Sequence, residues 1–290
     1  MKNKSFLLLF FFLFLCQVSF AQQTILNDSN LPIMVISTDI DPDTNAPIDI
    51  PDEPKVLGSM QLIYRPDGSR NYLTDSTNES FLNYKGRIGI ELRGSSSQAL
   101  DKKPYGFTTL LQDGDSNNNV SLLGMPSEND WVLNSLAYDP SMIRDYLSYT
   151  LASNMGNYAP RVQYIEVIVN GDYKGVYFLT EKVKRDSDRV NLKKIADDDN
   201  DFPDITGGYI IKADKTTGGD EIAWTMPNYG GWDTNFLHHY PKTEDITSAQ
   251  DNYIETIFYN LADQTNPANT SIIDGYPSMI DIPSFVDYIL

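Results

Sequence analysis

Alternating apolar and polar residues predict a chain rich in β-strands. The clearest case is Arg87–Arg93, where Ile88, Ile90 and Leu92 fall on one face. A hairpin turn is predicted at Asn170-Gly171-Asp172, because these residues adopt the left-handed backbone that a tight turn requires. Further strands are predicted over residues 31–36, 103–111, 164–169, 173–183 and 209–213.

Apolar residues at helical spacing predict three helices. The first begins at Asp139-Pro140, with aspartate as N-cap, and stops at Gly156. The second follows the capping box formed by Thr247 and Gln250. The third starts near Ser284, and we expect that the chain is a truncated fragment, since its sequence stops inside this helix. The stripe of the first helix comprises Ile143, Tyr146, Leu147, Thr150 and Leu151.

The first 21 residues are predicted to be an export signal. Lys2 and Lys4 precede an apolar run from Phe6 to Cys16, and the small-x-small pattern at Ser19-Phe20-Ala21 follows it. The run is shorter than the roughly 20 residues of a membrane span. We therefore expect an extracytoplasmic protein, secreted or in the cell envelope, without a membrane span after cleavage.

Charge and composition narrow the function classes. The chain has 40 acidic and 22 basic residues and a net charge of −18, which argues against binding nucleic acid or an anionic membrane surface. It has no GxSxG, HExxH, Walker or GxGxxG motif. Its two histidines, His238 and His239, are adjacent, so a histidine triad or a multi-histidine metal site is not expected.

Two charged features are candidates for chemistry. The run from Arg93 to Ser97 ends a strand, and Lys102 and Lys103 open the next, so cations and small residues could hold a phosphate there. The alternative is an ordinary serine-rich turn. Glu181 ends an apolar strand face, where it either borders a cleft or marks the end of the strand.

Four ordered blocks carry a resemblance to a known family. They are IELRGSSSQ with KKPYGF, then NDWVLNSLAYDPSMIRDYLSYTLASNMGNYAPR, then YIEVIVNGDYKGVYFLTEKVKRDSDRVNL, and finally GGYIIKADK, across residues 87–215. These blocks resemble the CotH kinase-like family, named for a spore-coat protein.

The resemblance implies an α+β fold like that of atypical protein kinases. A mostly antiparallel small-lobe sheet with a packed helix would cover residues 56–183, after an N-terminal strand and acidic linker over residues 22–55. Residues 184–290 would begin a large lobe that is incomplete in this chain. The implied function is transfer of a phosphoryl group from ATP to hydroxyls of a protein substrate, with Mg or Mn.

Site residues also follow from the resemblance. Lys103, or Lys102, would contact the ATP phosphates with Arg93 nearby. Asp145 or Glu166 would orient that lysine, and the sequence does not decide between them. The segment Leu179 to Val183 would be the hinge, with Glu181 close to the adenine. The predicted catalytic residues are Lys103 and Asp145, and the predicted cofactor-binding residues are Arg93, Lys102, Lys103, Glu166 and Glu181.

One departure from the family pattern bears on activity. An Asp-Phe-Asp type run, whose aspartates would hold the metal ions, does not occur up to Leu290, so the fragment is expected to lack turnover. The alternative is a non-catalytic surface or matrix module that binds protein or polysaccharide. Aromatic residues that could stack on sugars support it, namely Trp224, Tyr229, Trp232 and Tyr240.

Overall fold

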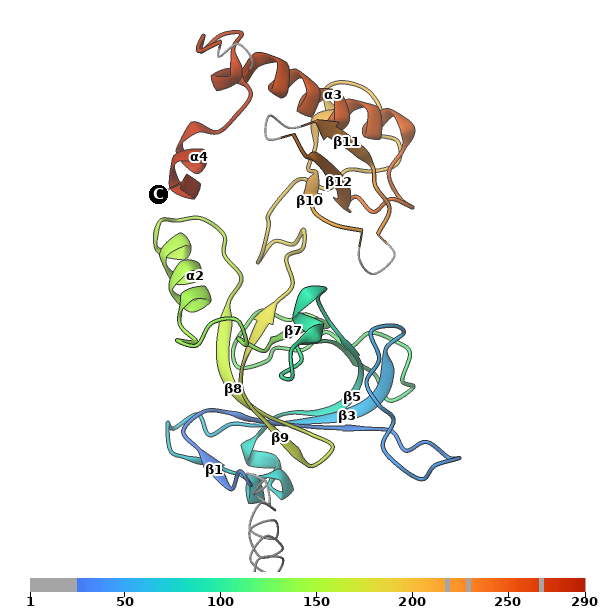
Figure 1. Cartoon of the computed structure of the whole chain (residues 1–290), viewed down its shortest axis with the longest axis vertical. Coiled ribbons are helices and arrows are strands. Elements are labelled where there is room, and N and C mark those ends of the chain that lie inside the picture. The colour runs from blue at the N-terminus through green and yellow to red at the C-terminus, as the bar shows by residue number, and fades with distance from the viewer. Residues whose placement is uncertain (1–24, 217–219, 228–230, 266–268, 290) are drawn as a thin grey trace, which may run out of the picture.

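The computed structural model describes residues 25–216, 220–227, 231–265 and 269–289. Seven strands form a closed barrel, in the lower half of Figure 1. They are β2 (Ile33–Thr38), β3 (Val56–Ile63), β5 (Leu82–Leu92), β6 (Tyr105–Leu110), β7 (Asp130–Asn134), β8 (Val162–Val169) and β9 (Asp172–Glu181).

The barrel follows the order β2-β3-β5-β6-β7-β9-β8. Neighbouring strands pair antiparallel, except that β2 and β8 pair in parallel and close the barrel, with Ile33 opposite Glu166. The alternating residues of β5 place Ile88 and Ile90 in the main core. Trp131 and Tyr177 from other strands fill the same cluster, so the barrel is packed with side chains.

Short elements surround the barrel. A two-stranded pair and two 3₁₀ helices lie at the side where Ile33, Ile63 and Ile168 form a second buried cluster. A third 3₁₀ helix lies in the loop between β5 and β6. These elements are β1 (Asp28–Ser29), β4 (Asn71–Tyr72), η1 (Leu73–Thr77), η2 (Glu79–Phe81) and η3 (Ser96–Ala99).

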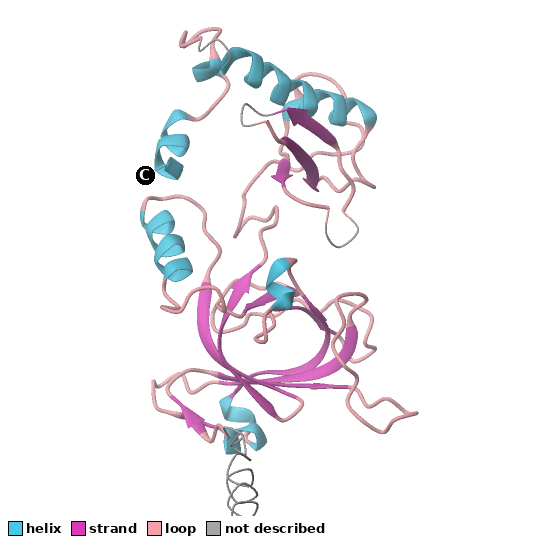
Figure 2. Ribbon diagram, viewed as in Figure 1, coloured by secondary structure: helices cyan, strands magenta, loops and turns pink. Residues whose placement is uncertain are grey.

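The second part of the chain is a three-stranded sheet covered by a long helix. Trp224 and Phe236 stack with ring centroids 5.4 Å apart, and Phe258 packs on both rings. Figure 2 shows this unit beyond one end of the barrel. Its elements are η4 (Asp204–Thr206), β10 (Ile210–Ala213), β11 (Trp224–Pro227), β12 (Asp233–Tyr240) and α3 (Ser248–Thr265).

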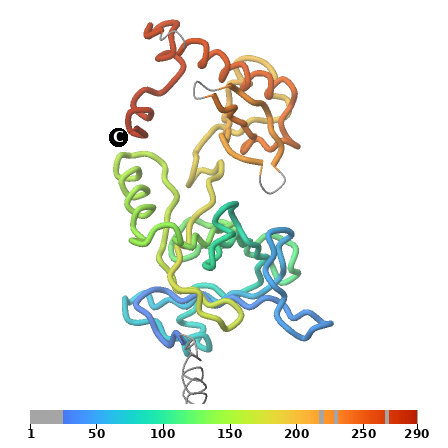
Figure 3. The backbone as a smooth tube through the Cα atoms, in the orientation of Figure 1, coloured from blue at the N-terminus to red at the C-terminus, as the bar shows by residue number. Residues whose placement is uncertain are grey.

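Two more helices complete the described chain. α2 (Arg144–Asn154) lies between β7 and β8, and α4 (Ile282–Ile289) follows η5 (Tyr276–Ser278). Figure 3 traces the path from the barrel to the C-terminal helices. Among the described residues, no helix combines the length and hydropathy needed to cross a bilayer. The export signal predicted over residues 1–21 lies outside the described residues.

The predicted fold class is wrong. The strands form a closed barrel rather than a kinase-like small-lobe sheet with a packed helix. Alternation along a strand shows which residues share a face, but it carries no information on the parallel pair β2 and β8 that closes the barrel. α2 is not packed as predicted either, because none of its residues is buried, although the Tyr146 ring lies 5.7 Å from that of Tyr164 in β8.

Candidate functional site

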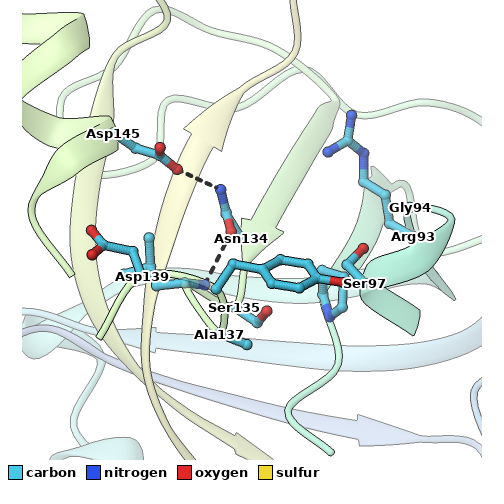
Figure 4. Close-up of a pocket in the computed structure, with 11 residues that line it drawn as sticks. Arg93, Gly94, Ser97, Asn134, Ser135, Ala137, Asp139 and Asp145 are labelled. Carbon is cyan, nitrogen blue, oxygen red and sulfur yellow. Dashed lines mark hydrogen bonds between the residues drawn. The ribbon is translucent and has the colours of Figure 1, made fainter. Parts of the chain in front are cut away.

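A pocket of about 330 Å³ lies where three segments of the chain meet. The β5–β6 loop contributes Arg93, Gly94, Ser97 and Pro104 to its lining. The end of β7 and the loop after it form another wall, and α2 adds Asp145. Figure 4 shows Asn134 between Asp145 and Arg93 in this view. The other lining residues are Ser135, Leu136, Ala137, Tyr138 and Asp139.

Sheet pairing places the first two walls side by side. β5 pairs with β6 and β6 with β7, so the loop after β5 lies near the end of β7. Arg93 N donates to Pro104 O at 3.0 Å and closes the base of the loop. Gly94 has a φ of +93°, and a Cβ there would collide with Ser97 Oγ. Glycine is therefore required for this tight loop.

Arg93 provides a cation that no described residue neutralises. Its side chain is exposed, and its guanidinium has no hydrogen-bond or ion-pair partner among the described residues. Most other arginines of the barrel are paired, as Arg87 is with Asp39 at 2.7 Å. Arg93 can therefore bind an anion without first breaking an ion pair.

Asp145 is held by the end of β7. Asn134 Nδ2 donates to Asp145 Oδ2 at 3.1 Å, and Asn134 Oδ1 accepts Leu136 N at 3.0 Å. The nearby phenol of Tyr149 is affected by two of the charged groups of the pocket. Burial and the Asp145 carboxylate raise the pKa of Tyr149, and the Arg93 guanidinium opposes that change. Arg93 and Asp145 thus act on one region of the site.

Asp139 shapes the entry into α2. Its carboxylate accepts Ser141 Oγ at 2.6 Å and the backbone N–H groups of Ile143 and Arg144 at 3.0 and 2.9 Å. These hydrogen bonds, that of Ser141 first, lower the pKa of Asp139 to about 2. The sequence predicted this aspartate as the helix cap, although the first helical residue is Arg144 rather than Pro140.

The two predicted lysines have protein partners. Lys103 Nζ donates to Gln98 O at 2.6 Å, inside the loop that carries Arg93. Lys102 Nζ donates to Val176 O and lies 4.7 Å from the centroid of the Tyr177 ring. Burial lowers the pKa of Lys102. Neither lysine is among the residues that line the pocket.

The two predicted glutamates lie elsewhere. Buried Glu166 accepts Ser29 Oγ at 2.8 Å and the Tyr173 hydroxyl at 2.6 Å. Glu181 accepts Arg161 N at 2.8 Å and Arg161 Nη1 at 3.0 Å, and Arg189 Nε lies 3.2 Å from it. The structure therefore places Arg93 and Asp145 in one pocket and the other four residues outside it. Their roles as site residues stay predictions.

Sequence reasoning missed Asn134 and Tyr138 in the pocket. The signal for Asn134 was a polar residue ending the buried run Trp131–Leu133. Tyr138 was visible only as an aromatic residue in the loop before α2, and it is 64% exposed. Arg161, the partner of Glu181, was also missed, because the two residues are on different strands or loops with no shared local pattern.

The aromatic residues considered for sugar binding lie in different surroundings in the structure. Trp224 is buried in the core under α3, so it packs inside the protein and does not offer a surface for a sugar. Tyr240 lies under Arg185, with 5.5 Å between the guanidinium carbon and the ring centroid. Trp232 is exposed, and Tyr229 lies outside the described residues.

Comparisons with known proteins identify the family. A search among curated proteins found no match. A family model described as CotH kinase protein matches residues 90–290, which covers the β5–β6 loop, β7 and α2. The resemblance seen in the sequence is confirmed, and the chain belongs to the CotH kinase family.

Proposed function

We propose that this chain binds the phosphates of ATP in the Arg93 pocket, as part of an extracytoplasmic phosphotransferase that acts on protein hydroxyls. Membership of the CotH kinase family supports a kinase-related function. The observation that carries the proposal is the unpaired, exposed guanidinium of Arg93 in a pocket of about 330 Å³. Guanidinium binds phosphate through two parallel hydrogen bonds, so it suits this ligand.

The remaining pocket residues have roles that follow from their chemistry. Gly94 and Ser97 let the backbone of the loop approach an anion closely. The ring of Tyr138 lines the same pocket and offers a face for stacking of the base. Asp145, oriented by Asn134, lies where it can accept a hydrogen bond from the ligand.

A metal site does not emerge from the described residues. No group of three or more His, Cys, Asp or Glu side chains among them is arranged to hold an ion. The pocket has two carboxylates, Asp139 and Asp145, and that of Asp139 is already bound by Ser141 and Arg144, so the two do not make a site.

The proposal is tested by calorimetric binding of tripolyphosphate and of ATP to the full chain. A charge-assisted hydrogen bond contributes ~1.5–3 kcal/mol, so Arg93→Ala should weaken both ligands about 10- to 100-fold. Arg70→Ala is the matched control, since Arg70 pairs with Asp28 beside β4. Equal loss in both variants contradicts the assignment. Absence of binding to the unaltered chain contradicts the proposal and favours the non-catalytic surface module.

Export is part of the same proposal. The basic start, the apolar run and the Ser19-Phe20-Ala21 pattern in the sequence support cleavage after Ala21. Expression with these residues should release a protein that begins at Gln22 into the extracytoplasmic fraction. Mass spectrometry of the N-terminus measures this, and an uncleaved chain that stays in the cytoplasm would contradict it.

A further inference from the structure

One contact joins β12 of the three-stranded sheet to the segment that follows the barrel. His239 Nε2 lies 2.7 Å from Val183 O, just after the end of β9. Figure 1 shows this segment running from β9 toward β10. A carbonyl oxygen only accepts, so Nε2 carries a hydrogen and donates it. Nδ1, the other ring nitrogen, has no hydrogen-bond partner among the described residues, so it is the atom at which this imidazole gains or loses a proton.

His239 lies on the face of the sheet that is opposite α3. Side chains alternate along a strand, so His238 lies on the other face, where its Nε2 is 2.9 Å from Asp251 Oδ1 of α3. Leu237 shares the face of His239 and is 1% exposed. Lys212 of β10 is the register partner of Leu237, so it belongs to the same face. Lys212 and His239 therefore lie on a covered face that is directed away from α3.

Positive charges from three segments of the chain act on His239. Burial lowers the pKa of the His239 imidazole, although the hydrogen bond to Val183 O opposes this change. The same pKa is lowered further by the charges of three lysines, namely Lys242, Lys212 and Lys182. Like charges disfavour one another's charged forms, so these groups repel each other where the segment after β9 meets the sheet.

The ammonium group of Lys182 has no direct partner. Lys182 is partly open to solvent, yet burial by the surrounding residues lowers its pKa, and the charge of Asp130 opposes this change. Three other cations lower that pKa further, namely Lys184, Lys55 and Lys242. The Asp130 carboxylate is itself bound by Lys184 Nζ at 2.7 Å. Since no hydrogen bond or ion pair joins Lys182 Nζ to a described residue, its charge is only partly balanced.

Lys242 is unpaired as well. It lines a polar pocket of about 410 Å³ that also contains three carboxylates. Asp220 is paired with Lys212. Neither Glu221 nor Glu244 forms an ion pair with Lys242, and no other part of the chain that the structure describes does so. Two unpaired ammonium groups and one titratable imidazole thus come together in a chain whose net charge is −18.

We propose that Lys182, Lys242 and His239 form a second anion site, between the barrel and the three-stranded sheet, that binds one phosphate group. The two ammonium groups match the charge of a phosphate, which is close to −2 near neutral pH. A bound phosphate offsets the repulsion among the cations, so the imidazole gains its proton more readily when the site is filled. The site shares no residue with the Arg93 pocket, so it does not depend on whether that pocket binds ATP.

An NMR titration of the histidine side chains tests the site. His238 and His239 are the only histidines of the chain, and the His238→Gln variant identifies the His239 signal. The full chain is titrated with pH in inorganic phosphate and, for comparison, in sodium chloride at the same ionic strength. Phosphate should raise the His239 midpoint by at least about 0.5 pH unit relative to chloride and leave that of His238 unchanged. Equal His239 midpoints in the two salts would overturn the proposal.

Lysine variants show whether the effect comes from this site. Lys182→Gln with Lys242→Gln should remove the difference between phosphate and chloride. Lys193→Gln is the matched control, because Lys193 pairs with Asp204 at an exposed position, and it should leave the difference intact. A difference that survives in the double variant would contradict the assignment. Arg93→Ala should also leave it intact, and its loss there would show that the phosphate binds in the Arg93 pocket instead.

The phosphate can be a free anion or a group carried by a protein. Phosphoserine in place of inorganic phosphate separates these sources. An equal rise of the His239 midpoint with phosphoserine supports a site for a phosphorylated protein segment. A rise with inorganic phosphate alone supports a site for the free anion. No rise with either ligand would show that the cations of this region do not form a phosphate site.

Discussion

Glu181, at the end of β9, forms a buried ion pair with Arg189 in the segment that follows the barrel. Removing its charge tests how much this pair contributes to stability. The Glu181 side chain is 0% exposed, and that of Arg189, 3.2 Å away, is 1% exposed. Glu181→Gln removes the charge and leaves Arg189 with Asp186 at 3.2 Å and Glu128 at 3.7 Å. Breaking a buried ion pair costs about 3–5 kcal/mol, and the remaining carboxylates place this loss near 3 kcal/mol.

Urea unfolding followed by circular dichroism measures this loss. With a slope near 2 kcal/mol/M, typical for urea, the midpoint should fall by roughly 1.5 M. Glu79→Gln is the control, because Glu79 is 76% exposed where it pairs with Lys85, so its loss should stay below about 1 kcal/mol. Adding Arg189→Met to Glu181→Gln should recover part of the stability, since the buried cation that has lost one of its carboxylate partners is then gone. A Glu181→Gln loss no larger than that of the control would refute the reasoning.

Three further predictions concern the pocket. The carboxyl of Asp139 should titrate at about 2, below its unfolded value. The hydrogen bonds from Asp139 to the start of α2 are then fully present above about pH 4 and are lost as the pH falls through 2. Carboxyl NMR of Asp139 and amide exchange in α2 measure this loss. An Asp139 titration midpoint near pH 4 contradicts the prediction. Tyr138→Ala should weaken ATP about tenfold but leave tripolyphosphate unchanged in calorimetry, whereas Tyr138→Phe keeps both affinities, because stacking needs only the ring. Arg93→Ala should weaken tripolyphosphate at least fivefold more than Lys103→Ala does, since the Lys103 ammonium is bound to Gln98 O at 2.6 Å; the reverse order would identify the lysine as the phosphate ligand.

Local patterns predicted the elements well. Asn170 and Gly171 have φ values of 51° and 80°, as the hairpin signal between β8 and β9 requires. The capping box also marked its helix, because Thr247 Oγ1 and Gln250 Oε1 make the expected hydrogen bonds where α3 begins. Each of these signals depends on residues that are neighbours in the sequence, so the sequence alone was sufficient.

Local patterns could not predict which strands pair to close the barrel. β2 pairs with β8, more than 120 residues later, and nothing in either strand specifies the other as its partner. The stripe of α2 misled for a related reason. Apolar spacing predicts that a helix has one face to bury, but it does not name the surface that buries it, and in this structure Leu147 and Leu151 are each 52% exposed.

The candidate site likewise contains residues that the sequence indicated and residues that it did not. Arg93 was found because a cation next to a glycine turn is visible in the sequence, and Asp145 entered through the family resemblance. Asn134, which links Asp145 to the barrel, was missed because its role depends on the 3.1 Å contact across the loop before α2. Polar residues that position others leave no local pattern when they act through the fold.

Two walls of the pocket are held differently: the β5–β6 loop is tied to the barrel by its backbone, whereas α2 has no buried residue. The backbone of Arg93 is held by the barrel through the 3.0 Å hydrogen bond from Arg93 N to Pro104 O. Asp145 lies on a helix with no buried residue, and Asn134 alone ties its carboxylate to β7. Whatever holds α2 therefore sets where the Asp145 carboxylate lies relative to the β5–β6 loop. One such tie is the hydrogen bond from Asn157, just after α2, to Asp287 of α4, a residue 130 positions further along the chain.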